Sequence, residues 1–212
     1  MARATAGALT ALAVVLALAG CGSADAESAP PPAASTVTAT PTPIPTPAVD
    51  VPIAAATQAP VRDPQPPARV VVASADVDVP VVPVGVETGG FMELPVDPAI
   101  AGWYRFGSDP ASADGNVVIS AHVDAPSYPI GPFSRLRDLA AGEVVEVTDA
   151  AGSVHRYSVE SVTYYPKADL PVDDLFARSG TRALVLITCG GAFDPTSGRY
   201  ADNVVAIATP IP

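Results

Sequence analysis

Two side chains in this 212-residue sequence are of the types that covalent catalysis needs, a thiol and an imidazole. Cys189 ends the apolar run 183–188 and precedes two glycines, so we expect a buried strand that runs into a glycine turn and presents the sulfur. His122 ends a second apolar run, 116–121. A thiolate nucleophile served by a histidine is the arrangement used for nucleophilic acyl transfer. The alternatives are a buried, inert cysteine and a histidine whose ring is bonded to Asp124.

Acyl transfer also needs a positive or hydrogen-bond-donating group for the oxyanion that forms when a thiolate attacks a carbonyl. Arg199 follows the thiol by ten residues, in an expected loop before the last strand, and is the candidate. Its alternative is a solvated loop arginine. The other histidine, His155, lies within an expected strand beside Arg156 and is predicted to face solvent. One cysteine and two histidines have no recognised zinc spacing, and the sequence has no phosphate loop or dinucleotide fingerprint, so we expect neither metal nor cofactor.

Strands must position these residues, and the sequence predicts about eight of them over roughly 145 residues, enough for a closed or nearly closed all-β barrel. Short helices are expected at 132–139 and 171–177. The runs that read as strands, by apolar content or alternation, are 70–73, 77–84, 116–121, 143–148, 154–162, 183–188 and 203–208.

The N-terminus resembles an export signal. Arg3 supplies a basic start, residues 4–19 are uncharged, and Leu18-Ala19-Gly20-Cys21 closes the segment like a bacterial lipobox. We therefore expect cleavage within residues 1–21 and lipidation of Cys21, with a signal-anchor helix or a plain secretory signal as the alternatives. The protein is then extracytoplasmic and tethered to the outer face of the membrane. Cys189 remains as the only other cysteine, which excludes an intramolecular disulfide in the mature domain.

Residues 26–67 are rich in Pro, Ala and Thr and show no periodicity, so we expect a disordered, partly polyproline spacer with a reach on the order of 100 Å. The domain that carries chemistry is expected at residues 69–212. The net charge of −11 argues against binding to nucleic acid or, through a basic patch, to anionic lipid.

Segments around both reactive residues resemble sortases, most closely class F sortases of actinobacteria, over roughly residues 69–212. The histidine segment is Ala121-His122-Val123-Asp124. Further similar segments are Ile187 to Asp194 around the cysteine, Tyr200 to Val205, Pro132 to Leu136 and Tyr165-Pro166-Lys167.

The resemblance implies an eight-stranded sortase barrel and transpeptidation. Cys189 is then expected to attack the Thr–Gly bond of an LPxTG-like sorting signal and to form a thioacyl enzyme. An amine, from a peptidoglycan precursor, would release the acyl group, and His122 would serve as general acid and then base. No acidic cluster identifies a calcium site of the kind that some sortases use.

Two positions depart from the pattern that the resemblance sets. Ala121 precedes the histidine where glycine is usual, and Ala201 stands where many relatives carry the arginine. Arg199 is the nearest substitute, because residues two apart on a strand share a face. Two alternatives stay open: a lipoprotein binding module that has lost catalysis, which Ala201 favours, and another cell-wall cysteine acyltransferase such as an L,D-transpeptidase. The latter carries its histidine close to the thiol, whereas 67 positions separate the two here.

Overall fold

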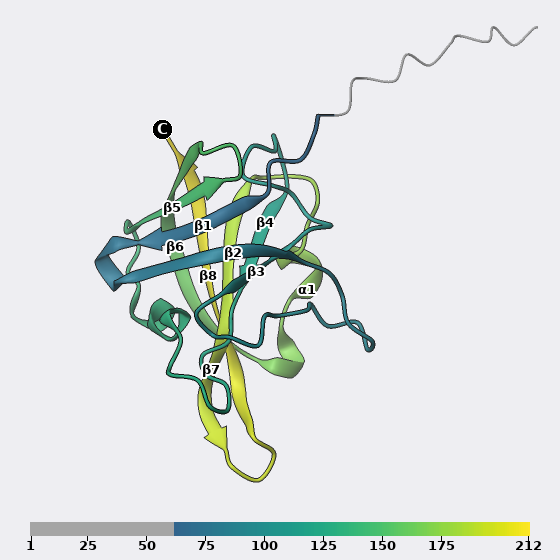
Figure 1. Ribbon diagram of the computed structural model, residues 1–212, viewed down its shortest axis with the longest axis vertical. Helices are drawn as coiled ribbons and strands as arrows, with labels where there is room; N and C mark the ends of the chain where they lie inside the picture. The colour runs from purple at the N-terminus through teal and green to yellow at the C-terminus, as the bar shows by residue number, and fades with distance from the viewer. Residues whose placement is uncertain (1–61) are drawn as a thin grey trace, which may run out of the picture. The chain divides into compact units, whose positions relative to one another are not determined.

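Eight strands close into a β-barrel within residues 62–212, the part of the chain that the computed structural model describes (Figure 1). Around the barrel the order is β1-β2-β3-β4-β7-β8-β6-β5, and the pairing of β5 with β1 closes the barrel. The β2–β3 and β4–β7 pairs are parallel and the others are antiparallel. The all-β, eight-stranded prediction is confirmed. The strands are β1 (Pro67–Val72), β2 (Val77–Val84), β3 (Ala101–Tyr104), β4 (Asn116–Ser120), β5 (Val144–Asp149), β6 (Val154–Pro166), β7 (Ala183–Asp194) and β8 (Arg199–Ile211).

The predicted signal segment with Cys21, and the predicted spacer up to residue 61, lie outside the described residues. Within residues 62–212, no helix has the length and apolar character needed to cross a membrane. The first described residues are already in contact with the barrel, and β1 begins at Pro67, two residues before the expected start of the domain.

Alternating burial builds the barrel interior. Val145 and Val147 of β5 are buried while their neighbours are partly exposed, and Leu184 and Leu186 of β7 face the same interior. Tyr157 on β6 is the largest side chain there and is fully buried. Each such side chain contributes about 1.5–3 kcal/mol on burial, so the alternating strands specify which face turns inward.

β3 is the strand that the sequence pattern did not predict. It has four residues, and Ala101, Gly102 and Trp103 are all buried, so neither alternation nor length marks it. A Cβ on Gly102 would lie 2.9 Å from the side chain of Val84, which explains why glycine is needed between β2 and β4. The indole N–H of Trp103 donates to the carbonyl oxygen of Ser108 at 3.0 Å.

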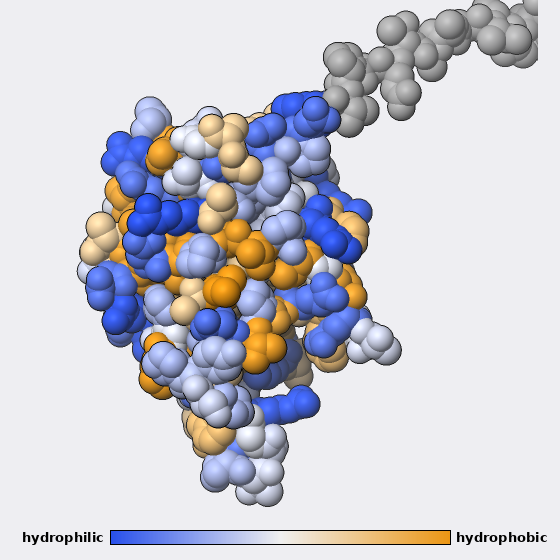
Figure 2. Space-filling view, viewed as in Figure 1, coloured by the Kyte–Doolittle hydropathy of each residue, from blue (hydrophilic) through white to orange (hydrophobic). Residues whose placement is uncertain are grey.

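β7 and β8 are longer than the apolar runs predicted, and they correct the expected glycine turn. β7 continues through Gly190 to Asp194 and stays paired with β8, with a register shift between Gly190 and Phe193. Gly191 takes the extra place in this β-bulge with φ of 74°. Arg199 is accordingly in β8, opposite Asp194, rather than in a loop. The paired ends extend beyond the barrel as a hairpin (Figure 1), covered mainly by polar and weakly polar residues (Figure 2).

Short helical segments occur where they were expected, at η2 (Pro132–Asp138) and α1 (Val172–Leu175), with η1 (Ala73–Ala75) and η3 (Lys167–Asp169) in addition. Phe133 and Leu136 of η2 join the barrel interior. Leu175 of α1 packs instead with Val185 and Ile187 on the outer face of β7. The connection from β6 to β7 therefore covers part of the outer wall of the barrel.

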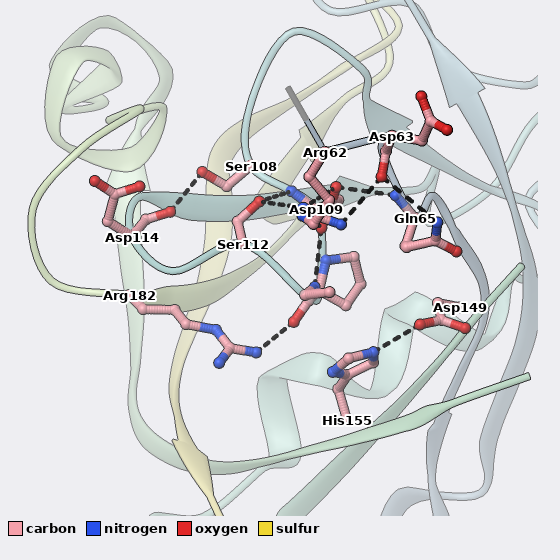
Figure 3. A network of polar contacts seen from close by, with 12 residues as sticks. Arg62, Asp63, Gln65, Ser108, Asp109, Ser112, Asp114, Asp149, His155 and Arg182 are labelled. Atoms are coloured by element: carbon pink, nitrogen blue, oxygen red, sulfur yellow. Dashed lines mark hydrogen bonds and ion pairs between the residues drawn. The ribbon is translucent and has the colours of Figure 1, made fainter. Parts of the chain in front are cut away.

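A polar network joins the N-terminal segment to the starts of β4 and β7 (Figure 3). Both carboxylate oxygens of the buried Asp109 lie 2.7 Å from Nη2 of Arg62, and the backbone N–H of Gln65 donates to Asp109 at 3.0 Å. Arg182, directly before β7, donates to the carbonyl oxygen of Pro110. The network fixes the entry of the chain into β1.

His155 differs from the prediction that it faces solvent. Its Nε2 lies 2.8 Å from Oδ2 of Asp149, which is buried at the end of β5 and also accepts backbone N–H bonds from Ala151 and Ser153 (Figure 3). Burial alone would raise the pKa of Asp149, but these hydrogen bonds outweigh it and lower the pKa. His155 is thus part of the β5–β6 hairpin structure.

Candidate active site

Cys189 lies on the outer face of β7. Leu184 and Leu186 point into the barrel, whereas Val185 and Ile187 point outward, and Cys189 continues the outward set. The thiol is partly exposed and is the free cysteine of the described residues. It stands at the edge of the cover formed by the β6–β7 connection, so the sulfur is accessible on one side.

Gly190 and Gly191 open the backbone beside the sulfur. A Cβ on Gly190 would lie 2.4 Å from Cγ2 of Val204, and one on Gly191 would lie 2.2 Å from Oδ2 of Asp202. Contacts that short do not occur without movement, so both positions require glycine. The two glycines allow the strand to bulge two residues after Cys189.

His122 is brought to Cys189 by the parallel pairing of β4 with β7. Parallel strands end at the same edge of a sheet, and the last residue of β4, Ser120, pairs with Ile187. The Ser120 hydroxyl donates to the carbonyl oxygen of Ile187 at 2.9 Å, and the Thr188 hydroxyl donates to that of Ala121 at 2.8 Å. These reciprocal bonds tie the residue before His122 to the residue before Cys189.

The loop after His122 is closed on itself. The backbone N–H of Gly131 donates to the carbonyl oxygen of Val123 at 2.7 Å. A Cβ on Gly131 would lie 2.9 Å from the carbonyl oxygen of His122 and 2.6 Å from Pro98. The loop can therefore lie flat against its neighbours only with glycine there. Ala121, where the resemblance suggested glycine, is buried within the barrel core.

One groove of about 790 Å³ contains all three predicted catalytic residues, Cys189, His122 and Arg199. Its walls come from the histidine loop, the end of β6 and the β7–β8 hairpin. The side chains of Val96 and Ile130 are largely exposed there, and Phe193 packs against Tyr200 with ring centroids 5.1 Å apart. The other lining residues are Val123, Asp124, Ala125, Pro126, Tyr128, Lys167 and Gly198.

Electrostatics in the groove favour a neutral imidazole. Partial burial lowers the pKa of His122, the Asp124 carboxylate opposes this shift, and the Lys167 ammonium adds to it. Asp124 is held by Tyr200, whose hydroxyl donates to Oδ2 at 2.7 Å. That hydrogen bond, with burial, raises the pKa of Tyr200. The Tyr200–Asp124 bond joins β8 to the histidine loop across the groove.

Lys167 is the charged residue that reasoning about catalysis from the sequence missed. Its Nζ donates to Sγ of Cys189 at 3.8 Å. The residue appeared only within a segment of family resemblance, and its approach to the thiol depends on how β6, β8 and β7 align. Arg199 is exposed on β8 and contacts the groove farther along the hairpin. Among residues 62–212, no group of three or more His, Cys, Asp or Glu side chains is placed to hold a metal ion.

The profile of the sortase domain matches residues 70–211. The match covers more than half of the chain, so the protein belongs to the sortase family. A sequence search of curated proteins found no match.

Solved structures of sortases share the barrel. Sortase C-1 of Streptococcus pneumoniae is 25% identical with a TM-score of 0.53, over 68% of this chain and 66% of that chain. Sortase C-1 of Actinomyces oris is 20% identical with a TM-score of 0.51, over 68% and 73%. Sortase A of Corynebacterium diphtheriae is 17% identical with a TM-score of 0.51, over 71% and 63%. This chain thus spans slightly less than two thirds of the pneumococcal enzyme.

Proposed function

We propose that this protein is a sortase that cuts an LPxTG-like sorting signal between Thr and Gly and joins the new acyl end to an amine of a peptidoglycan precursor. The observation that carries the proposal is the convergence of Cys189 and His122 on one groove where the parallel pairing of β4 with β7 ends. A thiol and an imidazole that share an open groove are the groups that acyl transfer requires.

The proposed reaction has two halves. The Cys189 thiolate attacks the Thr carbonyl carbon, and a thioester forms as the Thr–Gly C–N bond breaks, with His122 donating a proton to the leaving amine. The acceptor amine then attacks the thioester carbonyl and gives a proton to His122, and the thiolate leaves. Arg199, which contacts the same groove, is proposed to hold the carbonyl oxygen or the neighbouring peptide backbone.

The proposed setting is extracytoplasmic, with Cys21 lipidated and residues 26–67 acting as a spacer from the outer face of the membrane. The resemblance to class F rests on the segments around His122 and Cys189 and stays part of this proposal. This proposal gives the protein three partners: sorting-signal peptides, a peptidoglycan amine and the lipid bilayer. Radiolabelled palmitate in the wild-type protein but not in Cys21→Ala would support the anchor, and equal labelling would contradict it.

The alternative is a sortase-like lipoprotein that binds peptides without turnover, and Ala201 is the observation that favours it. The decisive experiment incubates the purified protein with an LPxTG peptide and an amine acceptor and follows the products by mass spectrometry. A thioacyl adduct on Cys189 with a ligated product supports the transpeptidase. Peptide binding without an adduct, when iodoacetamide still labels the thiol, supports the binding protein instead.

A further inference from the structure

The residue at issue is Lys167, the first residue of η3. Its ammonium nitrogen donates to the Cys189 sulfur at 3.8 Å, across from β7 and from a different part of the chain. Lysine carries three donors on a compact, strongly localised charge. A hydrogen bond from a charged donor stabilises an anion more than a neutral thiol. The contact is therefore directed at the reactive form of the nucleophile.

Strand register explains why Lys167 reaches the thiol. β8 runs between β6 and β7, and Tyr165 and Cys189 pair with the same residue, Asn203. Pro166 then pairs with Asp202. Lys167 follows Pro166 directly, and Ala201, the position where the sequence pattern leads one to expect an arginine, precedes Asp202 on β8. Since alanine ends at Cβ, position 201 supplies no cation, and Lys167 is the cation that contacts the thiol.

The charge of Lys167 acts on both reactive groups. Besides the contact with Cys189, it opposes protonation of His122, adding to the effect of burial and against that of Asp124. Arg199 is placed differently. Its register partner is Asp194, and no hydrogen bond or ion pair of its side chain occurs among the described residues. Of the two cations in the groove, Lys167 is the one in contact with a reacting atom.

We propose that Lys167 is a further catalytic residue, the cation that stabilises the Cys189 thiolate and then the oxyanion at the attacked carbonyl, in the place that Ala201 leaves vacant. Lys167 acts as a hydrogen-bond donor and forms no covalent bond: the proton of the thiol passes to His122. The part that concerns the oxyanion rests on the proposed function, whereas the part that concerns the thiolate does not.

The first test measures the local charge at Cys189 without any peptide. Two methanethiosulfonate reagents of similar size, one carrying a sulfonate and one a trimethylammonium group, react with the thiol, and the ratio of their rates reports the local potential. In Lys167→Met we expect the sulfonate-to-ammonium ratio to fall about tenfold, as expected when a unit charge a few ångströms away is removed. Lys167→Arg should retain the ratio of the wild-type protein.

Two comparisons make the result specific. Arg156→Met removes the same charge from a barrel position paired with Glu146 and should leave the ratio unchanged. The double variant Lys167→Met with Ala201→Arg should recover most of the ratio and most of the acylation rate, because the cation then approaches from the neighbouring strand. Thermal unfolding and labelling by neutral iodoacetamide check that each variant is folded and its thiol open.

The proposal is overturned if Lys167→Met keeps the ratio of the wild-type protein, or if Arg199→Met causes the large fall. A wild-type protein that shows the Lys167-dependent ratio but forms no thioacyl adduct with any sorting peptide would remove the proposed function and leave the thiolate contact standing. A wild-type enzyme that ligates peptides while Lys167→Met has unchanged single-turnover acylation would remove the catalytic role of Lys167 alone.

Discussion

The paired strands β4 and β7 have polar side chains at both ends of their pairing, and the two ends use them in opposite ways. At their starts, the buried Asp109 accepts bonds from Arg62, from Gln65 and from the backbone of Ala111, and Arg182 is bonded to Pro110. At the other end of the β4–β7 pairing, Cys189 and His122 line an open groove, and the side-chain contact to the thiol is the long one from Lys167. One end is closed by internal bonds, while the other leaves the thiol and the imidazole in an open groove.

The two histidines repeat this contrast. His155 is fixed to a buried carboxylate, whereas His122 stands near Asp124 while that carboxylate accepts a bond from Tyr200 instead. The two histidines therefore differ in what holds them: a buried carboxylate fixes His155 within the β5–β6 hairpin, whereas His122 faces the open groove.

The largest expected effect is that of Cys189→Ala. It should abolish both the thioacyl adduct and peptide ligation, because no other thiol occurs in residues 62–212. Its free energy of unfolding should stay within about 0.5 kcal/mol of that of the wild-type protein, since the site is open on one side. Mass spectrometry and urea unfolding on the same preparation check this. A large loss of stability would show that the groove end is also structural.

Replacing each of the two histidines by alanine tests the comparison next. His122→Ala should slow turnover about 10²- to 10⁴-fold, the usual contribution of general acid–base catalysis. His155→Ala should leave the turnover number unchanged and reduce stability by about 1–3 kcal/mol, since it removes a partner of the buried Asp149. Initial rates at saturating peptide and thermal unfolding separate the two effects. Slow turnover in His155→Ala with an unchanged melting temperature would contradict this assignment of turnover to His122 and stability to His155.

Asp109→Ala should weaken only the polar network before β4 and should not affect the groove. Losing the carboxylate leaves the N–H groups of Gln65 and Ala111 without their acceptor, at a cost of about 1–3 kcal/mol in stability. A drop of several degrees in the melting temperature is expected for a domain of this size. The rate of iodoacetamide labelling at Cys189 should not change. A parallel change in labelling rate would mean that the strands couple their two ends.

The smallest effect is a pH dependence of stability. The pKa of His122 is lower in the folded protein than in the unfolded chain, where it is about 6.5. His122 therefore contributes to the free energy of unfolding above that pH, and the contribution is lost as the pH falls below it. The pKa of Asp149 is also lowered in the folded protein. Asp149 therefore contributes to the free energy of unfolding above a pH of about 3.9 and loses this contribution at lower pH. Urea unfolding at pH 7.5 and 5.5 should show a smaller decrease for His122→Gln than for the wild-type protein. Equal decreases would argue against this linkage.

The barrel and the approximate site could be predicted from sequence for a definite reason. Strands with one buried face alternate, and apolar runs that end in a polar residue single out Cys189 and His122, although β7 continues beyond Cys189 to Asp194. β3 could not be predicted, because residues buried on both faces show no alternation. The continuation of β7 beyond the glycines was missed because a bulge and a turn have the same composition.

Lys167 could not be recognised as a neighbour of Cys189 for a different reason. Its position depends on the register of three strands, and β6 carries an irregularity between Val159 and Ser161 that shifts its pairing with β8. A shift of one residue exchanges the two faces of a strand. Counting along the sequence therefore cannot show which side chains of β6 meet the thiol.

The Arg62–Asp109 network also determines how the protein would respond to mechanical load. If the chain is held at its N-terminus while a substrate pulls on the groove, tension enters the domain at Arg62 and is taken first by that ion pair and by the ladders of β1 with β2 and β5. The bonds that set the distance between His122 and Cys189 lie at the other ends of β4 and β7. The bonds nearest to such a tether are therefore separate from those that hold His122 beside Cys189.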